Sequence, residues 1–279
     1  MINPEIMNPI DAVFQRLRSQ GRKAFMPFLT AGDPDLAATA RLVRTLSENG
    51  ADLLEIGFPY SDPIADGPVI QASYTRVLER GVHIEDIFAA ASKFNIPKTP
   101  LAAMVSYSLI HRRGAEAFLD RAAASGYSGA IVPDLPLEES ETLSRLACER
   151  DFKLIHLVTP ATPRERARAI AHSSSGFLYC VSVTGITGER DWLPPELLEQ
   201  LRWLRQQTDL PLCVGFGVSR PEHVQMLREV ADGIIVGSAF VRLLEKANSQ
   251  PRDSVAAAIA SLAQSLADAL NPPLSPPGS

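Results

Sequence analysis

Two carboxylates and the loop that joins them are the clearest candidates for chemistry in this sequence. Glu55 lies near the end of the otherwise apolar run Ala51 to Gly57, and Asp62 and Asp66 follow in turns of the Asp-Pro and Asp-Gly type. Burying a carboxylate is costly unless it is paired or used. A structural Glu55 held by an arginine or lysine is the alternative to a catalytic one. Taken alone, each aspartate is better explained as a turn residue.

Three glycine-containing segments form the second group of candidates. They are Gly185-Ile186-Thr187-Gly188, Gly215-Phe216-Gly217 and Val236-Gly237-Ser238-Ala239. Backbone N–H groups in such loops, especially at the start of a helix, bind an anion without a lysine. Each segment by itself is explained equally well as a tight turn. Three of them near one another favour a phosphate site.

Short apolar runs rich in branched residues must position these groups. Eight runs have the length and composition of strands: Ala24 to Leu29, Ala51 to Ile56, Leu101 to Val105, Gly129 to Val132, Phe152 to Val158, Phe177 to Val181, Leu210 to Val214 and Gly233 to Val236. The two-residue period of a strand places Glu55 on the same face as Leu53. One face of the second strand therefore carries a carboxylate.

Helical patterns fill the gaps between these runs. Examples are Leu36 to Glu48, Glu116 to Ala124, Glu138 to Arg150, Pro195 to Gln206 and Pro221 to Val230. Alternating helices and strands that are apolar on both faces predict parallel strands covered by helices. Eight such units, with no GxGxxG after the first strand, favour a closed (β/α)8 TIM barrel, an α/β fold, over an open sheet.

The barrel is expected to occupy residues 1–270 as a single domain. Residues 8 to 20 predict an extra N-terminal helix that closes the bottom of the barrel. Residues 271–279 contain four prolines and are expected to form a short disordered tail. In this fold the active site lies at the C-terminal ends of the strands. The carboxylate loop and the glycine segments follow strands, so all of them are expected at that end.

Composition narrows the class of protein. The chain has 279 residues, 46% of them hydrophobic and 21% charged, with a net charge of -5. It therefore lacks the basic footprint that nucleic acids and anionic membranes require. No apolar run approaches the length of a membrane span, and the N-terminus lacks an apolar signal region, which favours a cytoplasmic protein. Cys148, Cys180 and Cys213 are far apart in apolar surroundings and are interpreted as buried thiols.

Phosphate-binding barrels also include aldolases and isomerases, which are alternatives for this chain. An aldolase that forms a Schiff base needs a lysine near the site, and the predicted strands contain only Lys153, near the wrong end of the fifth strand. A metal-dependent isomerase would need clustered ligands. The five histidines show no HxH or HExxH spacing, so no metal is predicted.

From about Pro9 to Leu270 the chain resembles the tryptophan synthase alpha-subunit family. The resemblance rests on the segments Pro27 to Pro34, Glu55 to Pro68 and Val132 to Glu139, together with the three glycine segments. It implies a lyase that cleaves indole-3-glycerol phosphate into indole and glyceraldehyde 3-phosphate in tryptophan biosynthesis. It also implies an alpha2-beta2 heterotetramer with a beta subunit that carries pyridoxal phosphate, and no cofactor on this chain.

The resemblance also assigns residues. Glu55 and Asp66 match the family's two catalytic carboxylates, and Tyr179 matches an active-site tyrosine. Residues that match the lining of the substrate pocket are Phe28, Ile70, Thr187, Gly188, Phe216, Gly217, Gly237 and Ser238. In the implied retro-aldol cleavage, Asp66 is expected to be ionised and to accept the indole N–H. Glu55 is expected to move protons, with a pKa raised by burial.

One segment departs from the family pattern. The family has a tyrosine and an asparagine after the third strand, where this chain has Ser106 and Ser108 with Tyr107 between them. By resemblance this segment meets the beta subunit, so weaker coupling to that subunit is expected. Tyr107 could compensate in part if the strand were displaced by one residue. Two alternatives follow: a free-standing lyase that releases indole for another pathway, or mainly an activating partner for the beta subunit.

Overall fold

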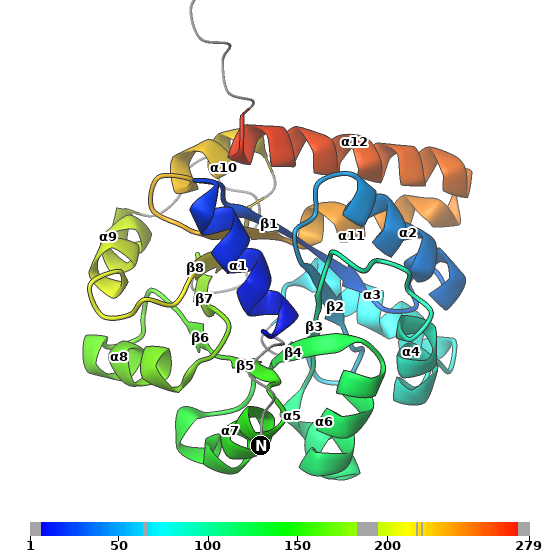
Figure 1. The fold of residues 1–279 in the computed structure, drawn as a ribbon. Coiled ribbons are helices and arrows are strands. Elements are labelled where there is room, and N and C mark those ends of the chain that lie inside the picture. The colour runs from blue at the N-terminus through cyan, green and yellow to red at the C-terminus, as the bar shows by residue number, and fades with distance from the viewer. Residues whose placement is uncertain (1–6, 64–65, 183–194, 216, 219, 273–279) are drawn as a thin grey trace, which may run out of the picture.

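The fold is a ring of parallel strands surrounded by helices (Figure 1). The computed structural model describes residues 7–63, 66–182, 195–215, 217–218 and 220–272. The strands in this part of the chain are β1 (Ala24–Thr30), β2 (Leu54–Gly57), β3 (Leu101–Met104), β4 (Tyr127–Ile131), β5 (Lys153–Ile155), β6 (Leu157–Val158), β7 (Leu178–Val181), β8 (Leu212–Gly215) and β9 (Gly233–Val236).

The predicted barrel is confirmed, with one local difference in the fifth strand. The order of the strands is β5-β4-β3-β2-β1-β9-β8-β7-β6, and all their pairings are parallel. The predicted run Phe152 to Val158 is divided at His156, whose N–H donates to Ser174 Oγ and whose carbonyl accepts from Tyr179 N. Because β5 pairs with β4 and β6 with β7, this single run closes the ring.

The helices follow the predicted alternation. Those in the described residues are α1 (Pro9–Ser19), α2 (Leu36–Glu48), α3 (Pro68–Glu79), α4 (Ile84–Ala91), α5 (Tyr107–Arg113), α6 (Ala115–Ala124), α7 (Glu141–Glu149), α8 (Arg164–Ser173), α9 (Pro195–Leu204), α10 (Pro221–Leu227), α11 (Ser238–Glu245) and α12 (Arg252–Leu270). Short 3-10 turns lie at Leu137–Glu139 and Lys246–Asn248. Helix α2 has the bounds that the sequence predicts, because Asp35 caps it by accepting from Ala38 N.

Alternate residues of each strand belong to two separate cores. On β2, Leu54 and Ile56 point outward and pack with the surrounding helices. Glu55 has the opposite parity and shares it with Leu53, which belongs to the cluster in the barrel interior. The strand register sets Glu55 beside Phe28 of β1 and Ala102 of β3. The inward position of Glu55 is therefore a consequence of barrel closure.

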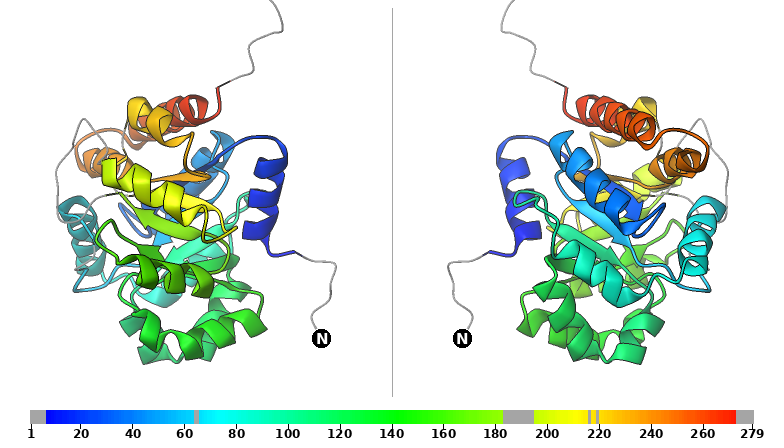
Figure 2. Two further views of the ribbon diagram at one scale, coloured as in Figure 1. Left: turned by 90° about the vertical axis from the view of Figure 1, so that its left-hand side faces the viewer. Right: turned by 90° about the vertical axis from the view of Figure 1, so that its right-hand side faces the viewer.

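Helix α1 closes one end of the barrel, as predicted from residues 8 to 20 (Figures 1 and 2). Its apolar residues Ile10, Val13, Phe14 and Leu17 are buried in the interior cluster, and the Phe14 and Phe177 rings lie 5.7 Å apart. The helix begins after Asn8, whose Oδ1 accepts from Ile10 N at 2.9 Å. The opposite, C-terminal ends of the strands are left for the loops that carry the candidate site.

The end of the chain and one cysteine complete the comparison with the sequence. Helix α12 ends at Leu270, and the Asn271 side chain exchanges two hydrogen bonds with the backbone of Lys23. Residues 273–279 of the expected tail lie outside the described residues. Cys180 and Cys213 are buried as expected, but the interpretation of Cys148 as buried is wrong. Helix α7 buries Leu143, Leu146 and Ala147, and its period turns Cys148 to solvent.

We expect Asn8→Ala to lower the free energy of unfolding by about 1–3 kcal/mol. The substitution removes the cap of α1 and leaves two backbone carbonyls, those of Ser128 and Asp151, without the amide that bonds them. Chemical denaturation measures the loss, with Gln15→Ala on the exposed face of α1 as the control. A change below about 0.5 kcal/mol for Asn8→Ala would show that the helix is held by its apolar face alone.

Candidate functional site

Glu55 is fully buried in the barrel interior and unpaired within the described residues. Its exposed fraction is 0%, and neither carboxyl oxygen has a hydrogen-bond partner there. Burial raises its pKa from 4.5 to about 8, with a further contribution from the negative charge of Asp66. No arginine or lysine of the described residues pairs with it, which counts against the structural alternative. Glu55 is therefore protonated at neutral pH and able to donate a proton.

The pocket wall beside Glu55 is built from β1 and β2. Phe28 is the register partner of Glu55 and is 3% exposed. At Gly57 a Cβ atom would fall 2.5 Å from the Phe28 ring and 2.6 Å from the Tyr74 hydroxyl. At Gly237 the nearest atom to a Cβ is again from Phe28, at 3.4 Å. Phe28 thus lies between the carboxylate strand and the start of α11, and its role in the substrate pocket stays a prediction.

Asp66 is held by the first turn of α3. Its backbone carbonyl accepts from Gln71 Nε2 at 2.8 Å, and its N–H donates to Pro63 O at 3.1 Å. The side chain is 5% exposed, and its Oδ2 has no partner within the described residues. Ile70, on the same helix, is buried in the interior cluster, and its role in the substrate pocket stays a prediction. Asp62 is exposed and bonds Ser61, as expected of a turn residue.

The Asp66 carboxyl ionises at a higher pH than a free aspartate. Burial and the negative charge of Asp134 raise its pKa from 3.8 to about 7, and the nearby Tyr60 hydroxyl opposes part of this rise. The Tyr60 hydroxyl lowers the pKa of Asp66 because it lies close to the carboxyl, although the two groups form no hydrogen bond of ordinary geometry. Asp66 therefore ionises near neutral pH in the ligand-free site. Sequence reasoning missed this because the desolvation comes from residues distant in the chain.

Three tyrosines surround the two carboxyls. Tyr179 on β7 is 3% exposed, and its pKa is raised by burial and then by the charges of Glu55 and Asp66, so it lies near both carboxyls. Sequence analysis did not identify Tyr60 and Tyr74, whose rings lie 5.7 Å apart. The signal for Tyr74 was available, since Ile70, Tyr74 and Val77 follow the helical period of α3 and all are buried.

Asp134, just after β4, is a third carboxylate at this end of the barrel. Ser106 Oγ donates to its Oδ2 at 2.6 Å, and Tyr107 N donates to its Oδ1 at 2.8 Å. Ser106 also caps α5 and bonds the Ser108 hydroxyl at 2.7 Å. The Tyr107 ring packs on the helical layer, 6.0 Å from the His111 ring, and not in the barrel interior. It therefore does not fill the space of a tyrosine at position 106.

The proposed phosphate end is described in part. Gly237 is the N-cap of α11 and Ser238 is its first residue, with both residues half-buried. Gly217, after β8, has φ of 75°, a left-handed conformation that favours glycine. Any side chain at position 215 would collide with Tyr179, because a Cβ atom at Gly215 would fall 2.2 Å from the Tyr179 hydroxyl. Thr187, Gly188 and Phe216 lie outside the described residues, so their predicted roles remain predictions.

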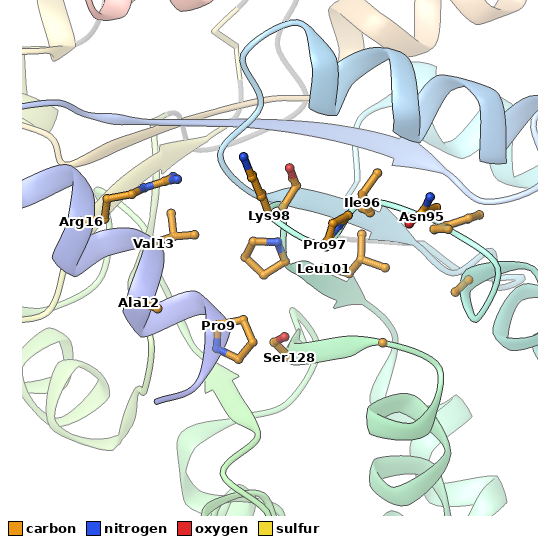
Figure 3. Close-up of a pocket in the computed structure, with 15 residues that line it drawn as sticks. Pro9, Ala12, Val13, Arg16, Asn95, Ile96, Pro97, Lys98, Leu101 and Ser128 are labelled. Carbon is orange, nitrogen blue, oxygen red and sulfur yellow. The ribbon is translucent and has the colours of Figure 1, made fainter. Parts of the chain in front are cut away.

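A cavity of about 500 Å³ lies at the other end of the barrel (Figure 3). Its walls come from α1, from the segment between α4 and β3, and from the beginnings of β3 and β4. Arg16 and Lys98 lie at its edge, and Arg16 is paired with Asp52 at 3.2 Å. Because the loops that carry function in this fold follow the strands, this cavity is separate from the candidate site.

The described residues hold no metal-binding cluster, and the strand lysine lies away from the site. Among the described residues, no group of three or more His, Cys, Asp or Glu side chains is arranged to hold a metal ion. Lys153 lies at the start of β5 and pairs with Asp11 at 2.6 Å and Asp151 at 3.0 Å, so it is far from the strand end that carries the site. In the same part of the chain, no helix has the length and apolar character needed to cross a membrane.

Comparison with known proteins agrees with this arrangement. The family model described as tryptophan synthase alpha chain matches residues 14–271. The chain belongs to the tryptophan synthase alpha chain family. A tryptophan synthase alpha chain from Rhodopirellula baltica is 51% identical over 260 residues, which cover 90% of this chain and 94% of that one.

Solved structures give the same family. The crystal structure of a tryptophan synthase alpha chain from Legionella pneumophila has a TM-score of 0.82 and 34% identity, over 94% of this chain and 98% of that one. A chain in the tryptophan synthase complex from Pyrococcus furiosus has a TM-score of 0.80 and 34% identity, over 88% and 98% of the two chains. The family therefore includes chains that are found in a tryptophan synthase complex.

We expect Glu55→Gln to stabilise the protein at high pH. A carboxyl whose pKa is raised on folding lowers stability progressively as the pH rises from its unfolded value of 4.5 toward about 8. The amide cannot ionise, so at pH 8 the variant should exceed the wild type by at least about 1 kcal/mol in free energy of unfolding. Denaturant titrations at pH 5 and pH 8 measure the difference, which should be small at pH 5. Equal differences at both values would rule out this linkage.

Proposed function

We propose that this protein is a lyase that cleaves indole-3-glycerol phosphate into indole and glyceraldehyde 3-phosphate, as a step of tryptophan biosynthesis. The observation that carries the proposal is the pair of Glu55 and Asp66, two buried carboxyls with raised pKa values and no cation beside them in the described residues. Membership of the tryptophan synthase alpha chain family supports it.

Glu55 acts first as an acid in the proposed reaction. It donates its proton to ring carbon C3 of the indole, which turns the ring into a leaving group. Positive charge then develops at the ring nitrogen, whose N–H donates a hydrogen bond to the Asp66 carboxylate. That charge favours the ionised form of Asp66 even though burial raises its pKa. Each carboxyl therefore has the protonation state that its role requires.

Glu55 then acts as a base. Its carboxylate takes the proton of the glycerol hydroxyl next to the ring while the bond between that carbon and C3 breaks. The electron pair of the broken bond returns to the indole ring, the hydroxyl becomes the aldehyde, and Glu55 is protonated again. A pKa of about 8 suits both steps, because it lies near the working pH. Tyr179 lies beside both carboxyls and is proposed to orient Glu55. The reaction as proposed needs no metal or cofactor on this chain.

The phosphate is proposed to bind at the glycine segments. Helix α11 begins at Ser238, and the N–H groups of a helix's first turn have no partners within the helix. These N–H groups and the helix dipole attract a phosphate. Gly217 and Gly237, with Thr187, Gly188 and Phe216, complete the proposed pocket, while Phe28 and Ile70 contact the indole. Phosphate binding energy then positions the ring between the carboxyls.

A beta subunit that carries pyridoxal phosphate is the proposed partner, in an alpha2-beta2 assembly. The support is family membership and the Pyrococcus furiosus complex. Three alternatives stay open: weaker coupling to the beta subunit, a free-standing lyase, and a mainly activating role. They stay open because Ser106, which bonds Asp134, stands where the family has a tyrosine. Indole release by the purified chain, with and without a beta subunit, distinguishes them. We expect measurable release by the chain alone. Release that requires the beta subunit would favour the activating role.

We expect Glu55→Gln and Asp66→Asn each to lower kcat by about 100-fold or more while the fold stays intact. Both substitutions keep the shape of the side chain and remove the group that moves a proton or balances charge. Steady-state assays of indole release measure kcat. Asp62→Asn, in the same loop but exposed, is the matched control and should keep wild-type activity. Turnover near the wild-type rate in either site variant would remove that residue from the mechanism.

The pH dependence of kcat/KM should be bell-shaped. Activity rises as Asp66 ionises, with a pKa of about 7, and falls as Glu55 loses its proton, with a pKa of about 8. The two carboxyls are coupled, so the limbs belong to the pair. Rates from pH 5.5 to pH 9.5 in buffers of constant ionic strength measure the profile. A flat profile across pH 6 to 9 would contradict the assignment of both groups.

A further inference from the structure

Asp33 is a buried carboxylate that the proposed reaction does not use. It follows β1 at the end of the barrel that carries the site, and its exposed fraction is 1%. Unlike Glu55, it is fully paired. Its Oδ2 accepts from Ser73 Oγ at 2.6 Å and from Arg76 Nη2 at 2.6 Å, and its Oδ1 lies 3.6 Å from Arg80 Nη1.

All three partners of Asp33 come from one helix. Ser73 and Arg76 are on α3 and Arg80 is its C-cap, and their spacing places them on one face of the helix. Arg80 also donates to the carbonyl of Pro34 at 2.7 Å, so the same loop is bonded twice. At Gly32 a Cβ atom would fall 2.9 Å from Val77, which shows how closely the loop packs on α3. The helix is thus fixed to the end of β1 by buried charge and by contact.

Helix α3 in turn holds Asp66. The helix begins two residues after Asp66, and Gln71 in its first turns donates to the carbonyls of Asp66 and Pro63 at 2.8 and 3.2 Å. A shift of α3 along β1 therefore moves the Asp66 carboxyl relative to Glu55, which is fixed by the strand ladder. Small displacements of this kind are costly in catalysis.

Arg76 also reaches the helix of the proposed phosphate end. Its Nη1 lies 3.8 Å from Glu245 at the end of α11, and the side chain is only 19% exposed. Helices α3 and α11 are neighbours on the outside of the barrel (Figure 1). The Arg76 guanidinium therefore contacts both the segment after β1 and helix α11, which begins with Ser238. Its own helix, α3, is bonded to the backbone of Asp66 through Gln71.

We infer that Arg76, through its ion pair with buried Asp33, is a positioning residue that sets the place of Asp66 relative to Glu55. The inference rests on the proposed function for its effect on catalysis, but its structural part does not. Arg76 is not among the residues proposed to contact the substrate. Losing the guanidinium should therefore loosen the first turns of α3 and reduce the rate of the chemical step, with little effect on phosphate binding.

The test compares Arg76→Gln, Arg76→Lys and the control Arg145→Gln, which removes an exposed arginine paired with Glu149 on α7. Hydrogen–deuterium exchange of the peptide covering residues 66–75 measures how readily the first turns of α3 open, without any need for activity. We expect exchange in Arg76→Gln to be at least tenfold faster there, and unchanged in peptides from α6 and α7. The lysine variant keeps the charge and should recover much of the protection, and Arg145→Gln should match the wild type.

Steady-state kinetics of the same proteins supply the second readout. We expect kcat of Arg76→Gln to fall by about 10- to 100-fold, KM to change less than about threefold, and Arg76→Lys to restore part of kcat. A folded Arg76→Gln that keeps wild-type exchange at residues 66–75, or keeps kcat within twofold, would overturn the inference. If Arg76→Gln does not fold, the same criteria apply to Asp33→Asn, which removes the charge that Arg76 pairs with and keeps the shape of the side chain. A wild-type chain that releases no indole would refute the proposed function, while the exchange result would still decide the inference.

Discussion

The structure depends on a carboxyl group that barrel closure places in an apolar interior. Each parallel strand of a closed ring turns alternate residues inward, and the register of β2 gives Glu55 the inward parity. The group has no exposed surface, because α1 closes one end of the barrel and apolar side chains and tyrosines pack around it. The pKa of about 8 follows directly from this desolvation. The proton chemistry proposed for the site rests on this value.

Buried carboxylates elsewhere in the molecule show what a structural solution looks like. Asp33 is bonded by Ser73 and Arg76, and Asp52 accepts from Phe25 N and pairs with Arg16. Both groups replace the hydration they lose on folding with protein donors. Glu55 and Oδ2 of Asp66 have no such donors among the described residues. Leaving a carboxyl unpaired costs stability, and active sites are where proteins retain such a cost.

The two carboxyls have different supports. Glu55 belongs to a strand whose place is set by ladders on both sides, so its surroundings are rigid and dry. Asp66 belongs to a loop whose geometry is set by α3, with Asp134 and Tyr60 close by. Burial raises both pKa values by a similar amount, from 4.5 to about 8 for Glu55 and from 3.8 to about 7 for Asp66. The lower value of Asp66 follows mainly from the lower starting pKa of an aspartate, and the supports decide where each carboxyl lies.

The sequence by itself determined the barrel and the identity of its main chemical groups. Apolar runs at regular spacing predicted the strands, strand parity placed Glu55 with Leu53, and the helical pattern of Leu36 to Glu48 gave the bounds of α2. These signals are local, since period and capping act within a few residues. They also gave one wrong result, Cys148, whose side of α7 depends on where that helix packs.

Only the tertiary structure decided the electrostatics of the site. The raised pKa of Asp66 requires burial in an interior built from many strands and the charge of Asp134, which lies 68 positions away by residue number. The absence of a cation beside Glu55 within the described residues, and the link from Asp33 to α3, also join distant segments. Desolvation and Coulomb interactions depend on distance in space and on what excludes water. Sequence spacing carries neither quantity until the chain has folded.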